Sequence, residues 1–303
     1  MGNRTGTSTK LLGLKFTNPL FLASGVMGTT PGGLKSAVDA GAGGVVTKSL
    51  GLEARKGHSS PNVVGVDCGY LNAMGLPNPG VEYFTEELSK VDVGAPVFAS
   101  IFGEDPDQFA KLTEIASGAA DGIELNLSCP HAEKVGSAVG TDPDLVERIV
   151  SKAVDATDLP VLAKLTPNTD RIVDIGRAAE SGGAAGVVAI NTVSGMAIDV
   201  ETKRPVLGNV TGGLSGRAIH PVAVKAVYDL YEGLSVPIIG VGGVETPETA
   251  VELILAGASA LQIGTAVATC ELSVFRDVDR GLAEYLSQED LSLEDLVGLA
   301  HRN

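Results

Sequence analysis

Residues 97–128 read VFASIFGEDPDQFAKLTEIASGAADGIELNLS, two apolar runs joined by a segment of different period. The runs at 97–103 and 122–128 are mainly apolar and do not strictly alternate, as in parallel strands covered by helices. Between them, residues 106–119 carry apolar side chains at helical spacing. The stretch therefore predicts a strand, a helix and a second strand parallel to the first.

The same unit recurs along the chain. Six more apolar runs predict strands at 21–24, 44–49, 161–165, 186–192, 237–243 and 260–266, and helical spacing recurs at 143–156, 170–181, 220–233 and 247–256. Asp142 and Thr246, each followed by proline, predict helix N-caps. Eight strands interleaved with helices indicate an α/β fold, a (β/α)8 TIM barrel with loops inserted at the C-terminal face of the strands. We expect residues 1–303 to form one domain. A doubly wound open sheet is the alternative, but no G-x-G-x-x-G motif follows the first strand.

Composition limits the partners of the chain. A net charge of −15 argues against nucleic acid and anionic membranes, because both are polyanions. A hydrated surface, as in a salt-tolerant cytoplasm, would account for the acidity without any partner. Cys68, Cys129 and Cys270 are too few and too scattered for a disulfide framework or a zinc site. No secretory signal or membrane-length apolar run is visible, so we expect a cytoplasmic protein without a metal.

In such a barrel the active site lies at the C-terminal ends of the strands. Lys48 and Lys164 fall there, and because a buried ammonium must be paired or neutralised, we expect both to face an anion. Glycines at 240–243 and 263–266 end the last two strands, where backbone N–H groups can cradle a phosphate, although tight turns would use the same residues. The predicted strand ends carry no Asp, Glu or His. They carry Ser24, Gly25, Lys48, Ser100, Asn126, Cys129, Lys164, Asn191, Thr192, Gly242, Gly243, Gly264 and Thr265.

A Gly- and Pro-rich insertion at 50–80 is long for a loop inside a compact domain, which indicates a functional role. Within it, Asn72 offers a donor and an acceptor that match the amide edge of a planar heterocycle. An asparagine in a plain turn is the alternative. Asn126 and Asn191 at the same barrel mouth favour recognition of imide-like groups.

Cys129 lies where the stretch ELNLSCP leaves its strand at Pro130. Its thiol is either core filler or a reagent on a movable loop, and the break at Pro130 favours the reagent. A thiolate is the reactive form, and a nearby lysine would favour it. His131 would either assist this chemistry or only solvate the loop.

The motifs together resemble the dihydroorotate dehydrogenase family over residues 11–285. They are LNAMGLPNPG (71–80), ELNLSCP (124–130), GTDPD (140–144), VLAKLTPN (161–168), INTVSG (190–195), NVTGGLSG (209–216), PIIGVGGV (237–244) and QIGTA (262–266). The chain is most similar to the cytosolic, cysteine-containing class, the catalytic subunit of the two-subunit, NAD-linked type. The resemblance implies oxidation of dihydroorotate to orotate in de novo pyrimidine biosynthesis. It also implies a homodimer core, a heterotetramer with an iron–sulfur, FAD-containing subunit, and electron transfer through that subunit to NAD⁺.

The resemblance also implies the roles of individual residues. Cys129 would remove the C5 proton while the C6 hydride passes to FMN, and Lys164 would stabilise negative charge on reduced flavin. FMN would contact Ser24, Gly25, Lys48, Ser49, Ser100, Asn126, Lys164, Ile190, Gly216, Gly242, Gly243, Gly264 and Thr265. Dihydroorotate would contact Lys48, Asn72, Ala73, Met74, Gly75, Leu76, Asn126, His131, Asn191 and Thr192.

Two residues depart from the family pattern, because His131 and Ser100 each stand where relatives usually carry Asn. Other functions stay open. The nearest are a dihydropyrimidine or dihydrouridine reductase, and a single-chain enzyme that reduces a soluble acceptor such as fumarate. More distant alternatives are a Schiff-base aldolase using Lys48 or Lys164 and a non-catalytic barrel serving as a structural partner.

Overall fold

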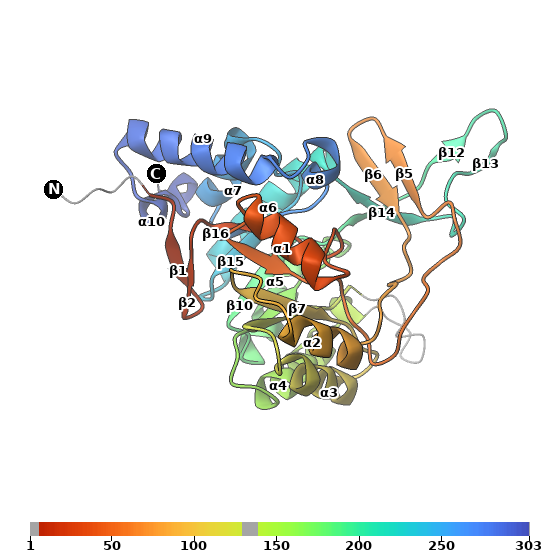
Figure 1. The fold of residues 1–303 in the computed structure, drawn as a ribbon. Helices are drawn as coiled ribbons and strands as arrows, with labels where there is room; N and C mark the ends of the chain where they lie inside the picture. The colour runs from red at the N-terminus through yellow and green to blue at the C-terminus, as the bar shows by residue number, and fades with distance from the viewer. Residues whose placement is uncertain (1–5, 129–138, 303) are drawn as a thin grey trace.

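The computed structural model describes residues 6–128 and 139–302. Eight parallel strands close into a barrel in the order β10-β15-β16-β3-β4-β7-β8-β9 (Figure 1). This closure confirms the predicted TIM barrel and excludes the open sheet. The barrel strands, each overlapping a predicted one, are β3 (Leu20–Leu22), β4 (Gly44–Val46), β7 (Val97–Ile101), β8 (Gly122–Asn126), β9 (Val161–Lys164), β10 (Gly186–Ala189), β15 (Ile238–Val241) and β16 (Ala258–Ile263).

Helices follow the strands along the chain and bury their apolar faces against the barrel. The predicted caps are confirmed: the Asp142 carboxylate accepts hydrogen bonds from the N–H groups of Asp144 and Leu145, and Thr246 forms a capping box with Thr249. The helices are α1 (Pro31–Asp39), α2 (Val81–Ser89), α3 (Pro106–Ala116), α4 (Pro143–Asp155), α5 (Ile172–Ser181), α6 (His220–Gly233), α7 (Pro247–Leu255), α8 (Ala266–Thr269), α9 (Val274–Glu289) and α10 (Leu293–Leu296), with 3-10 turns η1 (Val139–Thr141), η2 (Arg217–Ile219) and η3 (Leu299–His301).

The barrel interior is apolar at one end. An antiparallel hairpin of β1 (Thr9–Leu11) and β2 (Leu14–Phe16) covers that end, and the Phe16 and Phe21 ring centroids lie 4.7 Å apart. The interior apolar layer consists of Phe16, Phe21, Val46, Phe98, Leu162, Val188, Ile239 and Ala260. Side chains on one face of a strand recur every two residues. Two residues after Leu162 and Ala260, the chain therefore places Lys164 and Gln262 in the next layer toward the C-terminal ends.

The insertion at 50–80 contains a hairpin that the sequence did not reveal, β5 (Val63–Val66) and β6 (Gly69–Asn72). It joins β14 (Gly212–Ser215) and β11 (Val193–Gly195) in an antiparallel sheet of order β11-β14-β6-β5. A small ladder of β12 (Ile198–Asp199) and β13 (Arg204–Pro205) lies beside it, far from β1 and β2 (Figure 1). In the described part of the chain, none of the helices has the length and apolar character that crossing a membrane requires.

Candidate active site

A cavity of about 690 Å³ opens at the C-terminal ends of the barrel strands, below the sheet that contains β6 and β14. Its size suits an organic cofactor or substrate, since ligand sites usually span about 300–1,000 Å³. The structure brings nearly all predicted site residues to its lining: Ser24, Gly25, Lys48, Ser49, Asn72, Ala73, Met74, Gly75, Leu76, Asn126, Lys164, Ile190, Asn191, Thr192, Gly216, Gly242, Gly243, Gly264 and Thr265. Cys129 and His131 lie outside the described residues. Another cavity, of about 280 Å³, is lined by other residues, among them Asn18, Gly94 and Arg276.

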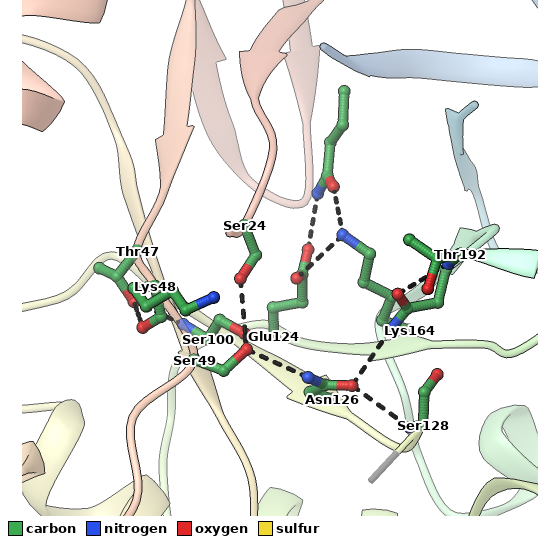
Figure 2. A network of polar contacts seen from close by, with 12 residues as sticks. Ser24, Thr47, Lys48, Ser49, Ser100, Glu124, Asn126, Ser128, Lys164 and Thr192 are labelled. Atoms are coloured by element: carbon green, nitrogen blue, oxygen red, sulfur yellow. Dashed lines mark hydrogen bonds and ion pairs between the residues drawn. The ribbon is translucent and has the colours of Figure 1, made fainter. Parts of the chain in front are cut away.

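Asn126, the last residue of β8, organises the polar side of the cavity (Figure 2). Its Nδ2 donates to Ser49 Oγ at 3.1 Å. Its Oδ1 accepts from Asn191 Nδ2 at 3.2 Å and from the backbone N–H of Ser128 at 3.2 Å. These contacts fix the amide and join the ends of β8 and β10, so two of the three predicted amides act as one hydrogen-bonded unit.

Ser100 is the one described residue of the predicted site that does not line the cavity. It is fully buried on β7, where its Oγ lies 3.0 Å from Ser49 Oγ and its N–H donates to Thr47 Oγ1. Ser49 Oγ in turn lies 3.3 Å from Ser24 Oγ. Ser100 therefore supports Ser49 from behind, and the predicted direct contact with a ligand finds no support in this geometry.

Lys48 lies at the cavity with only 7% of its surface exposed. Burial lowers the pKa of its ammonium from the ordinary value of 10.5, because desolvation disfavours the charged form. Among the described residues, no carboxylate forms an ion pair with it. A buried ammonium without a carboxylate favours an anionic ligand, as the sequence predicted.

Lys164 has a different environment. Its Nζ lies 3.4 Å from Glu124 Oε1 (Figure 2). It also donates to Gln262 Oε1 at 2.8 Å, and Gln262 Nε2 donates to Glu124 Oε2 at 2.6 Å. All three residues are buried and line the cavity. Glu124 is an acidic residue of the cavity that the predicted strand ends do not include. It lies two residues before the end of β8, so a list restricted to strand ends omits it.

Glycines form the opposite side of the cavity. Gly243, after β15, has φ +68°, and a Cβ there would lie 2.7 Å from the Cβ of His220. Gly216 has φ +97°, and a Cβ there would lie 2.8 Å from the Cα of Gly69. Among the described residues, no group accepts a hydrogen bond from the N–H of Gly243. A free N–H on backbone that favours glycine fits a phosphate.

The loop after β6 carries the remaining predicted residues. Asn72 Nδ2 donates to the carbonyl of Gly213 at 3.2 Å, which ties the loop to β14. His58, which was not predicted, also lines the cavity. Its backbone N–H donates to the carbonyl of Met74 at 2.9 Å, and its Nδ1 lies 3.2 Å from the carbonyl of Ala73.

Asn168 was also missed. Its Nδ2 donates to the carbonyl of Thr192 at 3.1 Å and its Oδ1 accepts from the N–H of Ser194 at 2.7 Å. Thr192 is thereby held at the cavity from the β9 side. The motif VLAKLTPN contains Asn168, so a reading of its last residue as part of the site would have found it.

Comparisons with known proteins agree with this geometry. The model of the family described as dihydroorotate dehydrogenase matches residues 7–286. The chain is 53% identical over 294 residues to "Dihydroorotate dehydrogenase B (NAD(+)), catalytic subunit" of Pyrococcus furiosus, covering 97% of this chain and 98% of that protein. Proteins of the same name are 51% identical over 296 residues in Methanosarcina acetivorans (96% and 95% covered) and 47% identical over 298 residues in Methanocaldococcus jannaschii (97% and 97% covered).

Proposed function

Because the chain belongs to the dihydroorotate dehydrogenase family, and is thus an oxidoreductase of pyrimidine biosynthesis acting on dihydroorotate, we propose that its cavity binds FMN and dihydroorotate together. One observation carries the proposal. A single cavity holds both the buried ammonium of Lys48, with which no carboxylate of the described residues pairs, and the Gly243 N–H after β15, which no described group accepts. The two features suit a ligand carboxylate and a ligand phosphate respectively.

FMN fits the residues present. Its phosphate would lie on Gly216, Gly242, Gly243, Gly264 and Thr265, and its ring and ribityl chain would lie along Ser24, Gly25, Lys48, Ser49, Asn126, Lys164 and Ile190. Bound flavin would supply the hydride acceptor of the reaction. The protein would contribute orientation, since Ser49 and Asn126 are held by hydrogen bonds to their neighbours before any ligand binds.

Dihydroorotate would place its carboxylate at Lys48 and its ring amides at Asn72, Asn126, Asn191 and Thr192. Ala73, Met74, Gly75 and Leu76 line the same part of the cavity and would exclude water from the ring. Amide side chains that are already fixed would orient the ring at little entropic cost.

Cys129 is our candidate for the base that removes the C5 proton. Ser128 directly precedes it and lines the cavity, with a buried Oγ that has no hydrogen-bond partner among the described residues. The residue directly before Cys129 therefore lies at the cavity wall. His131 would add a hydrogen bond to the substrate from the same loop.

We also propose an electron-transfer partner. The relatives are named as NAD(+)-type catalytic subunits, which supports a second subunit that carries an iron–sulfur cluster and FAD and reduces NAD⁺. In this assembly, the chain would form a homodimer core. Co-purification of a second polypeptide, with NAD⁺ reduced only in its presence, would support this arrangement. Turnover by the chain alone with fumarate would favour a single-chain enzyme.

The test of the central proposal is spectroscopic. The purified chain is expected to show a flavin absorption band that anaerobic dihydroorotate bleaches. In Lys48→Gln, dihydroorotate should bleach the band only at far higher concentration, whereas dithionite should bleach it as in the unaltered chain. A flavin band that dihydroorotate never bleaches would refute the substrate, and a chain that cannot be loaded with FMN would refute the cofactor.

A further inference from the structure

Glu124, Lys164 and Gln262 form a closed ring of contacts inside the barrel, in which each side chain touches the other two. The three residues come from β8, β9 and β16 and are 0%, 5% and 1% exposed. They lie directly beyond the apolar layer that fills the other end of the barrel. Side chains this deeply buried keep only the partners that the fold gives them.

The chemistry of the three groups fixes how they are oriented. A lysine ammonium can only donate, so the oxygen of the Gln262 amide must face Lys164. The Glu124 carboxylate accepts, so the amide nitrogen must face Glu124. Of the three donors on Lys164, one is engaged by Gln262 and one by Glu124. Since Lys164 lines the cavity, one N–H remains for a bound ligand.

The ring also sets the charge that a ligand meets. The buried carboxylate of Glu124 offsets the charge of Lys164, whereas no described carboxylate offsets that of Lys48. At a buried site this difference is large, because solvent screens charges only weakly there. A flavin gains electron density when it is reduced, so an uncompensated lysine beside it would favour the reduced form.

We propose that Glu124 and Gln262 are positioning residues that aim one N–H of Lys164 at the flavin and limit how strongly the site prefers reduced over oxidised flavin. The inference rests on FMN binding in the proposed function. It gives the carboxylate a role in turnover, because a flavin that held its electrons too tightly would not pass them to an acceptor.

The test measures the dissociation constants of oxidised and dithionite-reduced FMN for the chain and its variants. Glu124→Gln removes the carboxylate charge. It is expected to raise the ratio of oxidised to reduced dissociation constants at least tenfold, which for a two-electron couple is a shift of about 30 mV toward positive potential. Asp121→Asn is the matched control. Asp121 directly precedes the first residue of β8, and its carboxylate accepts a hydrogen bond from the N–H of Val97. Removing this charge should change the ratio by less than twofold.

Gln262→Glu tests the same idea with the opposite sign. At pH 8.5 it adds a second carboxylate beside Lys164 and should lower the ratio of dissociation constants at least tenfold. General damage to the site would not change the ratio in opposite directions in the two variants. If Glu124→Gln fails to fold, this variant alone decides. Ratios within twofold of the unaltered chain, in protein that binds FMN and is bleached by dihydroorotate, would refute the inference alone. Failure of the unaltered chain to bind FMN would refute the proposed function and the inference together.

Discussion

Replacement of Lys48 by methionine should make the chain more stable than the unaltered chain when no substrate is present, and less stable than it when orotate is present. Lys48 is 7% exposed and no carboxylate of the described residues pairs with its ammonium, so folding desolvates this charge without an ion pair to offset the cost. Methionine has a similar length and no charge. Removing a poorly compensated polar group from a buried site should raise the free energy of unfolding by about 1–3 kcal/mol.

The pH dependence follows from the direction of the pKa shift. Burial lowers the pKa of Lys48 from its ordinary 10.5, so between the two values the unfolded chain binds more protons than the folded chain. Stability of the unaltered chain should therefore rise with pH across that interval. The advantage of Lys48→Met should be fully present below the folded-state pKa and should shrink as the pH approaches 10.5.

Orotate should reverse the order of stability. At 1,000 times its dissociation constant, a ligand that binds only the folded state stabilises it by about 4.1 kcal/mol, which exceeds the advantage of the methionine variant. The unaltered chain should gain this and Lys48→Met should gain little, because the substrate carboxylate would lose its cation.

The assay is urea unfolding of the FMN-loaded chain at pH 7 and pH 10, with and without orotate. Lys35→Met is the control, since Lys35 is exposed on α1 in a surface ion pair with Asp39 and should change stability by no more than about 0.5 kcal/mol. A Lys48→Met chain that is less stable than the Lys35→Met chain without orotate, or that gains as much from orotate as the unaltered chain, would refute the reasoning.

Other substitutions test other parts of the site. Gly243→Ala should lower FMN affinity at least tenfold and cost about 1–3 kcal/mol of stability, because φ is +68° and the Cβ would approach that of His220; unchanged FMN titration would contradict the cradle. Cys129→Ser should lower kcat about 10²–10⁴-fold with FMN binding retained, and full activity would remove Cys129 as the base. Substrate affinity should vary between about pH 5 and 8, the range in which an imidazole ordinarily changes charge, and His131→Asn should flatten that profile. Phe98→Ala should cost about 3–5 kcal/mol in thermal or urea unfolding, since it empties part of the fully buried interior layer.

The barrel could be predicted from the sequence because its signals are local. Each strand is a short apolar run, and caps such as Asp142 and Thr246 mark where helices begin. The sheet over the cavity could not be predicted, because it pairs Leu71 with Leu214, far apart in the chain. The sequence of a glycine-rich segment carries no side-chain pattern that identifies a pairing strand so far away in the chain.

The same limit explains the residues that were missed. Glu124 and Gln262 read as polar interruptions within apolar strands, and only their register across the closed barrel brings them to Lys164. Ser100 is the opposite case, a predicted residue that does not line the cavity. It lies on the strand that leads to the cavity, but Ser49 stands between it and the lining. Position at a strand end predicts which residues lie near the site, but it does not predict which of them line the cavity.

Lys48 and Lys164 show why that distinction matters for mechanism. By position in the predicted strands they are equivalent, two lysines at barrel strand ends, and only the family resemblance gives them different roles. In the structure one ammonium has no carboxylate partner and the other is held by Glu124 and Gln262. An uncompensated cation suits binding of a substrate that carries its negative charge throughout the reaction. A compensated one suits contact with a group that must gain electrons and then release them. Substitutions at the two sites should therefore have different effects. Lys48→Met should impair substrate affinity, whereas Glu124→Gln should change the reduction potential of the bound flavin.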